Sequence, residues 1–125
     1  MTKSCVFCQV SDEQVVASNE TMIAIRDIYP VTAGHTLVIP REHRGDFFDL
    51  SSEESVDAFK LLHELKAGIT KEDPSVLGFN IGANCGKEAG QTVFHCHIHL
   101  IPRRKGDMDR PEGGVRGVIP EKQSY

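Results

Sequence analysis

The stretch VFHCHIHLIP, residues 93–102, carries histidine at three alternate positions, His95, His97 and His99. Successive side chains of a β-strand point to opposite faces, so this spacing predicts a strand with three imidazoles on one face and hydrophobic side chains on the other. The alternative is a histidine-rich strand at the edge of the sheet whose imidazoles have no chemical role. Packing alone gives no reason to place three imidazoles on one face, and we therefore expect that face to form a chemical site.

The rest of the chain divides into further strand-like and helix-like segments separated by glycine and proline. Short hydrophobic and β-branched runs predict strands, and hydrophobic residues spaced by three and four predict one main helix. The sequence thus predicts a single α+β domain over 1–104, with an antiparallel sheet of about five strands, followed by an irregular tail over 105–125. The strands are expected at 13–18, 21–27, 35–40, 75–84 and 93–102, and the helix at 51–69.

The predicted helix begins with Ser51 and Glu54, which have the spacing of a capping box. His63 lies among charged residues and is expected on the solvent face of this helix. The hydrophobic stripe expected to face the core consists of Val56, Phe59, Leu62, Leu65 and Ile69.

The predicted strand at 75–84 alternates small or amide side chains with hydrophobic ones. We expect Leu77, Phe79 and Ile81 to face the helix, while the glycines and asparagines, Asn84 among them, form a face that admits a ligand. In the loop that follows, backbone amides, Gln91 and Thr92 could hold an anion. The alternative is a hairpin loop that needs glycine only for its turns.

The chain length and the net charge restrict the classes of function that the protein can have. The chain has 125 residues, enough for one domain, and a formal net charge of −4, which argues against electrostatic binding of polymeric nucleic acid or of an anionic membrane. A nucleotide could still bind at a local site. The first ten residues lack a long apolar run, and no run of about 18 apolar residues occurs elsewhere, so neither a signal peptide nor a membrane span is expected. We therefore predict a cytoplasmic protein.

Cys5 and Cys8 form a Cys-x-x-Cys pair near the N-terminus. This spacing allows two thiolates to share one zinc ion, with His43 and one of the three clustered histidines as candidate partners. A redox pair and two ordinary buried cysteines are the alternatives. The redox interpretation is weaker because no strand precedes the pair, as it does in thioredoxin-like folds.

Two further residues lie where binding residues commonly occur. His35 stands where a loop meets the predicted strand at 35–40, a place that is both exposed and rigidly held. Arg103 follows the histidine strand and could reach a phosphate, although a solvated basic cluster is the default interpretation.

Together these segments resemble the histidine triad superfamily. EAGQTVFHCHIHLIPR, residues 88–103, resembles the family signature of three histidines separated by hydrophobic residues, and GHTLVIP with Asp27 upstream resembles another family block. Cys96 departs from the pattern but is small and apolar enough to pack. The EAGQTV lead-in and the PR-x-x-GD continuation resemble the dinucleoside polyphosphate hydrolases, whereas Asn84 is more similar to the purine nucleoside phosphoramidases.

The resemblance implies a nucleotide hydrolase or transferase. His97 would attack the α-phosphorus and form a nucleotidyl-histidine intermediate, while His99 and His35 would flank the transferred group with hydrogen bonds or positive charge. The remaining substrate contacts implied are Asn84, Gln91 and Thr92 at phosphate or leaving group, Asp27 at the ribose, and Phe7, Ile25 and Ile28 around the base.

The resemblance also implies a structural zinc ion and a homodimer. The zinc ligands would be Cys5, Cys8, His43 and His95, so that His95 would orient the histidine segment rather than act in catalysis. A nucleotide-binding or zinc-stabilised module without catalysis is the alternative function, and the presence of His35, His97 and His99 argues against it.

Overall fold

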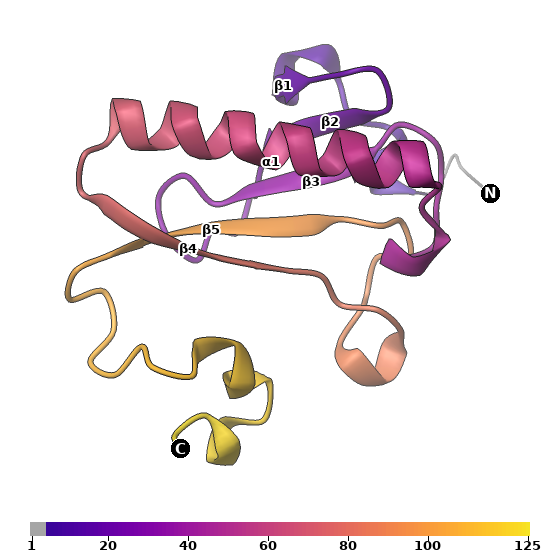
Figure 1. Ribbon diagram of the computed structural model, residues 1–125. Coiled ribbons are helices and arrows are strands. Elements are labelled where there is room, and N and C mark those ends of the chain that lie inside the picture. Colours follow the sequence, from indigo (N-terminus) through magenta and orange to yellow (C-terminus); the bar gives the residue numbers. More distant parts are fainter. Residues whose placement is uncertain (1–4) are drawn as a thin grey trace.

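The computed structural model describes residues 5–125, in which one long helix packs on a five-stranded antiparallel sheet (Figure 1). The strand order is β1-β2-β3-β5-β4, with every neighbouring pair antiparallel. The predicted α+β fold with one main helix is therefore confirmed. The elements are β1 (Val15–Ser18), β2 (Met22–Arg26), β3 (Thr36–Pro40), α1 (Ser52–Glu72), β4 (Val76–Gly82) and β5 (Ile98–Arg104).

Helix α1 begins at the predicted capping box, and this cap is tied to the histidine segment. The Ser51 hydroxyl accepts the backbone N–H of Glu54, and the Glu54 carboxylate accepts the backbone N–H of Ser51. The same buried carboxylate accepts Nε–H of Arg44 at 3.0 Å. The Arg44 carbonyl in turn accepts the backbone N–H of Cys96 at 2.7 Å, between His95 and His97. One network thus joins the helix start to the site.

The helix turns a different stripe toward the sheet than the sequence predicted. Ala58, Leu61, Leu65 and Ile69 are buried, whereas Val56 and Phe59 are about half exposed or more. Positions 58, 61, 65 and 69 also follow the three-to-four spacing, so two overlapping stripes compete and only one can face the sheet. The prediction is correct for Leu65 and Ile69 and wrong for Val56 and Phe59. Phe59 instead lines an apolar surface beside β4.

Strand β4 contains an irregularity that reverses the predicted direction of one side chain. Val76 pairs with Arg104 and Gly78 pairs with Arg103, so the register shifts between them. Val76 is buried in the helix-side core and Leu77 is 74% exposed. Beyond the irregularity, Phe79 packs against the helix-side core as predicted.

Strand β5 is shorter at its beginning than the predicted strand 93–102. It starts at Ile98, and residues 93–97 approach it as a bend without strand pairing. The cause is visible at Cys96, whose N–H binds Arg44 in a loop rather than a neighbouring strand. The alternation of faces nevertheless continues through the bend, because Cys96, Ile98 and Leu100 are all buried in the helix-side core.

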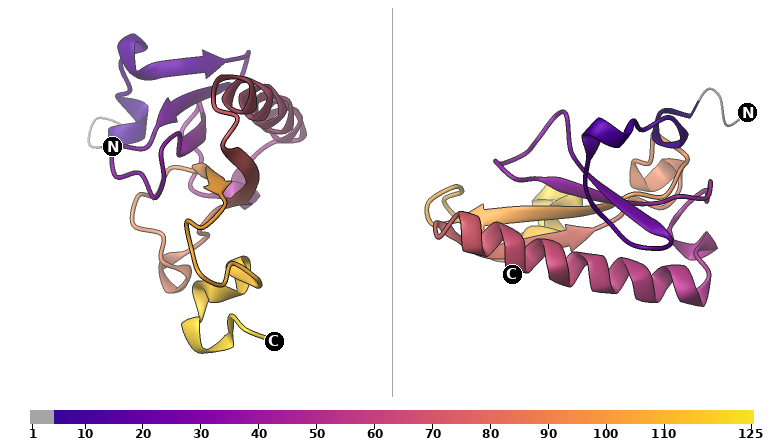
Figure 2. Two further views of the ribbon diagram at one scale, coloured as in Figure 1. Left: turned by 90° about the vertical axis from the view of Figure 1, so that its left-hand side faces the viewer. Right: turned by 90° about the horizontal axis from the view of Figure 1, so that it is seen from above.

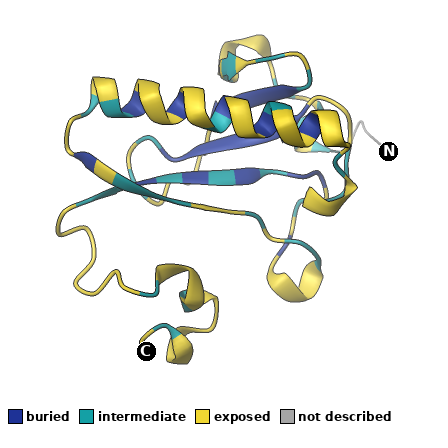
Figure 3. Ribbon diagram, in the orientation of Figure 1, coloured by how far each residue is buried: buried dark blue, intermediate teal, exposed yellow. Residues whose placement is uncertain are grey.

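The sheet has a second, smaller hydrophobic cluster on its other face. Phe7 and Val10 pack there with Val15 from β1, and Figure 3 shows buried positions along the central strands. The cluster consists of Ile23, Ile25, Leu37 and Ile39. Because β2 and β3 are covered on both faces, they form the rigid centre on which the site is built.

The tail beyond β5 has more regular structure than predicted. It contains two short 3₁₀ helices, η6 (Gly114–Val118) and η7 (Pro120–Lys122), on the side of the sheet away from α1 (Figures 1 and 2). Within residues 5–125, none of the helices combines the length and apolar character needed to cross a membrane.

Candidate active site and metal cluster

Four candidate metal ligands converge at the start of the histidine segment. The ligand atoms of Cys5, Cys8, His43 and His95 all lie within 4.8 Å of one another. His95 Nδ1 is 3.4 Å from both cysteine sulfurs, and His43 Nδ1 is 3.2 Å from Cys8 Sγ. A tetrahedral zinc ion with ordinary bond lengths separates sulfur and nitrogen ligands by about 3.6 Å. The donor set and its spacing therefore fit zinc.

His95 is arranged as a metal ligand in its hydrogen bonding as well. Its Nε2 lies 2.9 Å from the carbonyl oxygen of Pro40, which can only accept, so Nε2 carries the proton and the lone pair lies on Nδ1. Burial lowers the pKa of this ring, which keeps it neutral, as metal binding requires. Burial also raises the pKa of the Cys8 thiol, and the adjacent Cys5 raises it further. A cation bound at this position would instead lower the pKa of the Cys8 thiol.

The ring of His97 is oriented by a backbone carbonyl. Its Nδ1 lies 2.9 Å from the carbonyl oxygen of His95, so Nδ1–H donates to that oxygen. In the neutral ring the lone pair therefore lies on Nε2. The ring packs between Phe7 and His99, with centroid distances of 5.0 and 5.3 Å. The two neighbouring histidines thus differ in their surroundings, because His95 lies against the cysteines and His97 lies between Phe7 and His99.

His35 and His99 form a hydrogen-bonded pair whose protons are fixed by the backbone. The N–H of Val31 donates to His35 Nδ1 at 3.0 Å, so the proton of His35 lies on Nε2. That Nε2–H donates to His99 Nδ1 at 2.9 Å, which leaves the proton of His99 on its own Nε2. Buried His35 thus contacts His99 directly, and His99 keeps an N–H donor beside His97.

Both rings of this pair are kept neutral by burial. Burial lowers the pKa of His35, and the Asp27 carboxylate, with Oδ2 3.4 Å from His35 Nε2, opposes that effect. The pKa of His99 is lowered by burial, then by His97 and His35, and Asp27 again opposes the change. Below the ordinary value of 6.5 the unfolded rings bind protons that the folded rings exclude. Their contribution to stability is therefore present above pH 6.5 and is lost as the pH falls.

The residues predicted to hold the nucleoside lie on the same face. Asp27 follows β2, and its carboxylate accepts the N–H of Tyr29 at 2.9 Å while facing His35. Phe7 and Ile25 belong to the second hydrophobic cluster, whereas Ile28 is 74% exposed. Leu37 pairs with both Ile25 and His99 across the sheet and completes the surface.

The loop residues predicted to bind phosphate differ in their surroundings. Asn84 and Thr92 are exposed, whereas Gln91 is buried. The Gln91 amide accepts the N–H of Gly86 and donates to the carbonyls of Gly45 and Val93, so in this structure it holds the loop together. Arg103 donates to Asp107 and Asn80. Phosphate binding by these residues remains a prediction.

Several residues of the site were not found from the sequence. Leu37 could have been found, because it alternates with His35 and Ile39 in the predicted strand at 35–40. Val31 and Pro40 act through backbone groups, which carry no side-chain signal. The tail residues Val115 and Val118 come close to His99 only through the course of the chain after β5.

Comparison with known proteins agrees with this geometry. Residues 9–106 match the HIT domain family. A solved structure of a HIT family protein from Bacillus anthracis is 40% identical, with a TM-score of 0.74 over 86% of this chain and 78% of that chain. A zinc-bound histidine triad family protein from Mycobacterium smegmatis is 37% identical, with a TM-score of 0.77 over 86% and 80%.

Among curated relatives, the adenosine 5'-monophosphoramidase hnt1 of Schizosaccharomyces pombe is 34% identical over 104 residues, which cover 80% of this chain and 74% of the relative. The match to the HIT domain covers well over half of the chain. The chain therefore belongs to the HIT domain family.

Replacing Asp27 by asparagine should lower the pKa of both His35 and His99, because the carboxylate is the group that opposes their desolvation. NMR titration of the histidine ring signals measures both values. Asp12→Asn removes an equivalent charge from the exposed start of the chain and serves as the control. Unchanged midpoints in Asp27→Asn would show that the carboxylate does not act on the pair.

Proposed function

We propose that the chain hydrolyses a nucleotide at its α-phosphorus through a covalent intermediate on His97. The observation that carries this proposal is the bond from His97 Nδ1–H to the His95 carbonyl, which leaves the Nε2 lone pair available beside His99. A neutral imidazole is a competent nucleophile near neutral pH. Membership of the HIT domain family supports the same chemistry.

The proposed reaction has two displacement steps. In the first, His97 Nε2 forms a bond to phosphorus, and the electron pair of the broken bond leaves with the departing oxygen or nitrogen, a departing amine taking its proton from water. His97 becomes a phosphorylated imidazolium, which the His95 carbonyl stabilises through Nδ1–H. In the second, water attacks phosphorus, releases its proton to solvent and returns the electron pair to Nε2. His99 donates Nε2–H to a phosphoryl oxygen in both steps.

Two substrate classes compete within this proposal. The EAGQTV and PR-x-x-GD segments support a dinucleoside polyphosphate. Asn84 and the relationship to the yeast monophosphoramidase support a nucleoside phosphoramidate. In either case the base would lie on Phe7, Ile25 and Ile28, with Asp27 near the ribose. A nucleotide-binding module without turnover is the alternative of another class, and a cytoplasmic location remains a prediction.

His97→Ala should reduce turnover by about 10⁴-fold or more, because loss of a covalent nucleophile removes the whole pathway. Hydrolysis of a dinucleoside polyphosphate and of an adenosine phosphoramidate is measured, with nucleotide binding by calorimetry as the test of an intact site. His63→Ala, an exposed histidine on α1, is the matched control. Turnover retained in His97→Ala would rule out the covalent mechanism.

We further propose that Cys5, Cys8, His43 and His95 hold one structural zinc ion. The spacing of the four donors and the zinc-bound relative support this proposal. When bound, the ion would crosslink the N-terminal segment to the histidine segment. Its effect on His97 would pass through His95, whose carbonyl orients the His97 ring.

Cys8→Ser should lower the zinc content from about one ion per chain and lower the melting temperature, because a structural site contributes its binding energy to folding. Elemental analysis of denatured protein and a thermal melt measure the two effects. Cys85→Ser replaces a free cysteine outside the cluster and should keep its zinc. Wild-type protein free of zinc, with a melting temperature unchanged by added zinc, would contradict the proposal.

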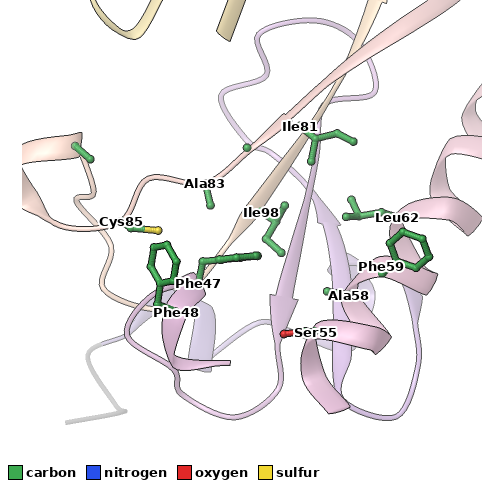
Figure 4. A pocket seen from close by; sticks show the side chains of 12 residues that line it. Phe47, Phe48, Ser55, Ala58, Phe59, Leu62, Ile81, Ala83, Cys85 and Ile98 are labelled. Carbon is green, nitrogen blue, oxygen red and sulfur yellow. The ribbon is translucent and has the colours of Figure 1, made fainter. Parts of the chain in front are cut away.

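The homodimer would form on the apolar surface between α1 and β4, to which Phe59 and Leu62 of the helix contribute. A groove of about 750 Å³ opens there, and Figure 4 shows Phe47, Phe48, Phe59, Leu62 and Ile81 around it. Phe48, Phe59 and Ile81 are each more than half exposed. Burying such surface against a second copy is favourable at about 25 cal/mol per Å².

Phe59→Asp should convert the dimer to a monomer, because a buried carboxylate without a partner is strongly unfavourable. Light scattering at micromolar concentration measures the mass. Val16→Asp places the same charge on an exposed valine of β1, at the opposite edge of the sheet from β4, and should remain dimeric. A monomeric wild-type protein would contradict the dimer.

A further inference from the structure

The loop between β2 and β3 contains the backbone group that selects which nitrogen of His35 carries the proton. The N–H of Val31 donates to His35 Nδ1 at 3.0 Å. The Val31 side chain is 69% exposed, so its own packing does little to hold that N–H in place. The position of the N–H therefore depends on how the next loop residues are fastened to the rest of the domain.

Thr32 fastens the loop to β5, beside which the loop lies (Figure 1). Its hydroxyl donates to the Pro102 carbonyl at 2.7 Å, and its own carbonyl accepts the backbone N–H of His35 at 3.1 Å. Pairing between β3 and β5 extends to Thr36 and Leu100, one strand position short of Pro102, which has no N–H to donate. The Thr32 hydroxyl thus binds a strand carbonyl beyond the end of that pairing.

A second tether holds the residue after Thr32. Arg104 Nη2–H donates to the Ala33 carbonyl at 3.0 Å. The same guanidinium donates to the Asp73 carboxylate at 2.8 Å and to the Ser75 hydroxyl at 3.1 Å, so the turn between α1 and β4 holds it in place. Two successive loop residues are therefore attached to β5.

The loop acts on two rings whose protons are coupled. Each neutral ring carries one N–H proton. With the Val31 N–H on His35 Nδ1, the His35 Nε2–H donates to His99 Nδ1, and the proton of His99 lies on Nε2. If the Val31 N–H moves away, His35 can carry its proton on Nδ1 and accept Nδ1–H of His99. His99 then has a lone pair on Nε2 in place of the donor.

The Asp27 carboxylate favours the same proton arrangement as the loop. Its Oδ2 lies 3.4 Å from His35 Nε2, where it attracts a proton to that nitrogen. Loss of one tether should therefore change the populations of the two arrangements and should not replace one by the other completely. A measurement of the populations is the appropriate test.

We propose that Thr32 is a positioning residue, whose hydroxyl holds the Val31 N–H on His35 and thereby keeps the proton of His99 on Nε2. Arg104 supports the same loop through Ala33. The assignment of the protons stands on the geometry of the loop alone. Its consequence for turnover rests on the proposed function, in which His99 Nε2–H donates to a phosphoryl oxygen.

Nitrogen NMR of isotope-labelled imidazole rings measures the proton positions, because protonated and unprotonated ring nitrogens differ widely in chemical shift. At about pH 8, above the ordinary pKa of 6.5, the rings are neutral. The wild-type protein should show both His35 and His99 mainly as the Nε2–H form. Thr32→Val removes the hydroxyl and should raise the Nδ1–H fraction of both rings together.

Matched variants assign the effect to the tethers. Thr32→Ser keeps the hydroxyl and should return both rings to the wild-type form. Thr70→Val is the control, because the Thr70 hydroxyl also donates to a backbone carbonyl, but within α1. Arg104→Gln removes the second tether and should also raise the Nδ1–H fraction. Its control is Arg41→Gln, since Arg41 donates to a backbone carbonyl between β1 and β2.

Turnover measures the consequence for the reaction. Thr32→Val should lower kcat by about threefold or more and change KM less, because the weakened donor acts on the phosphoryl group during reaction and a hydrogen bond of ordinary strength has about this effect. Thr32→Ser should keep the wild-type kcat. The substrate is the dinucleoside polyphosphate or the adenosine phosphoramidate, whichever the wild-type protein hydrolyses faster.

The outcomes separate this inference from the proposed function. Proton positions unchanged in Thr32→Val, or changed equally in Thr70→Val, would overturn the positioning role whatever the value of kcat. If Thr32→Val does not fold, unchanged positions in Arg104→Gln would overturn it instead. Changed proton positions with a wild-type kcat would overturn the link to the reaction. Absence of turnover in the wild-type protein would overturn the proposed function, and the NMR result would still decide whether Thr32 fixes the protons.

Discussion

The site depends on the three hydrogen-bonding groups of His95. Its Nε2–H is held by the Pro40 carbonyl at the end of β3, its Nδ1 faces the two cysteine sulfurs, and its own carbonyl accepts Nδ1–H of His97. Each bond fixes the next, because the Pro40 bond determines which nitrogen of His95 is free, and the position of His95 determines which nitrogen of His97 is free. A fully buried residue thereby orients the proposed nucleophile without contacting a substrate.

The helix supports the same segment from the other side. The Glu54 carboxylate accepts hydrogen bonds from both the backbone N–H of Ser51 at the helix cap and Nε–H of Arg44. The Arg44 carbonyl in turn accepts the N–H of Cys96, which lies between His95 and His97. Burial raises the pKa of the Cys96 thiol to about 12, so this side chain is a neutral part of the core. The segment is consequently held at His95 by the cysteine cluster and at Cys96 by the helix cap. A bend, rather than a paired strand, is what allows both attachments.

Sequence patterns predicted the fold where local and overall preferences agree. The alternation of residues correctly placed Cys96, Ile98 and Leu100 in the core, and the capping box at Ser51 correctly placed the helix start. The patterns failed where two arrangements are equally favourable locally. In α1 two overlapping hydrophobic stripes could face the sheet, and in β4 a register shift changes the face to which Leu77 points. They also could not reveal backbone partners such as Val31, because hydrogen bonds to N–H and carbonyl groups leave no trace in residue identity.

In the proposed function, the protonation pattern allows the site to act on phosphorus without a permanent positive charge on His35 and His99. Burial disfavours the charged forms of His35 and His99, so these rings contribute a hydrogen-bond donor rather than a permanent positive charge. In the proposed mechanism the positive charge is formed on His97 by the attack itself, next to the phosphoryl oxygens and against the His95 carbonyl. That positive charge lies beside the phosphoryl oxygens in the proposed intermediate. A neutral pair beside a nucleophile of this kind requires no basic cluster, which agrees with the acidic net charge of the chain.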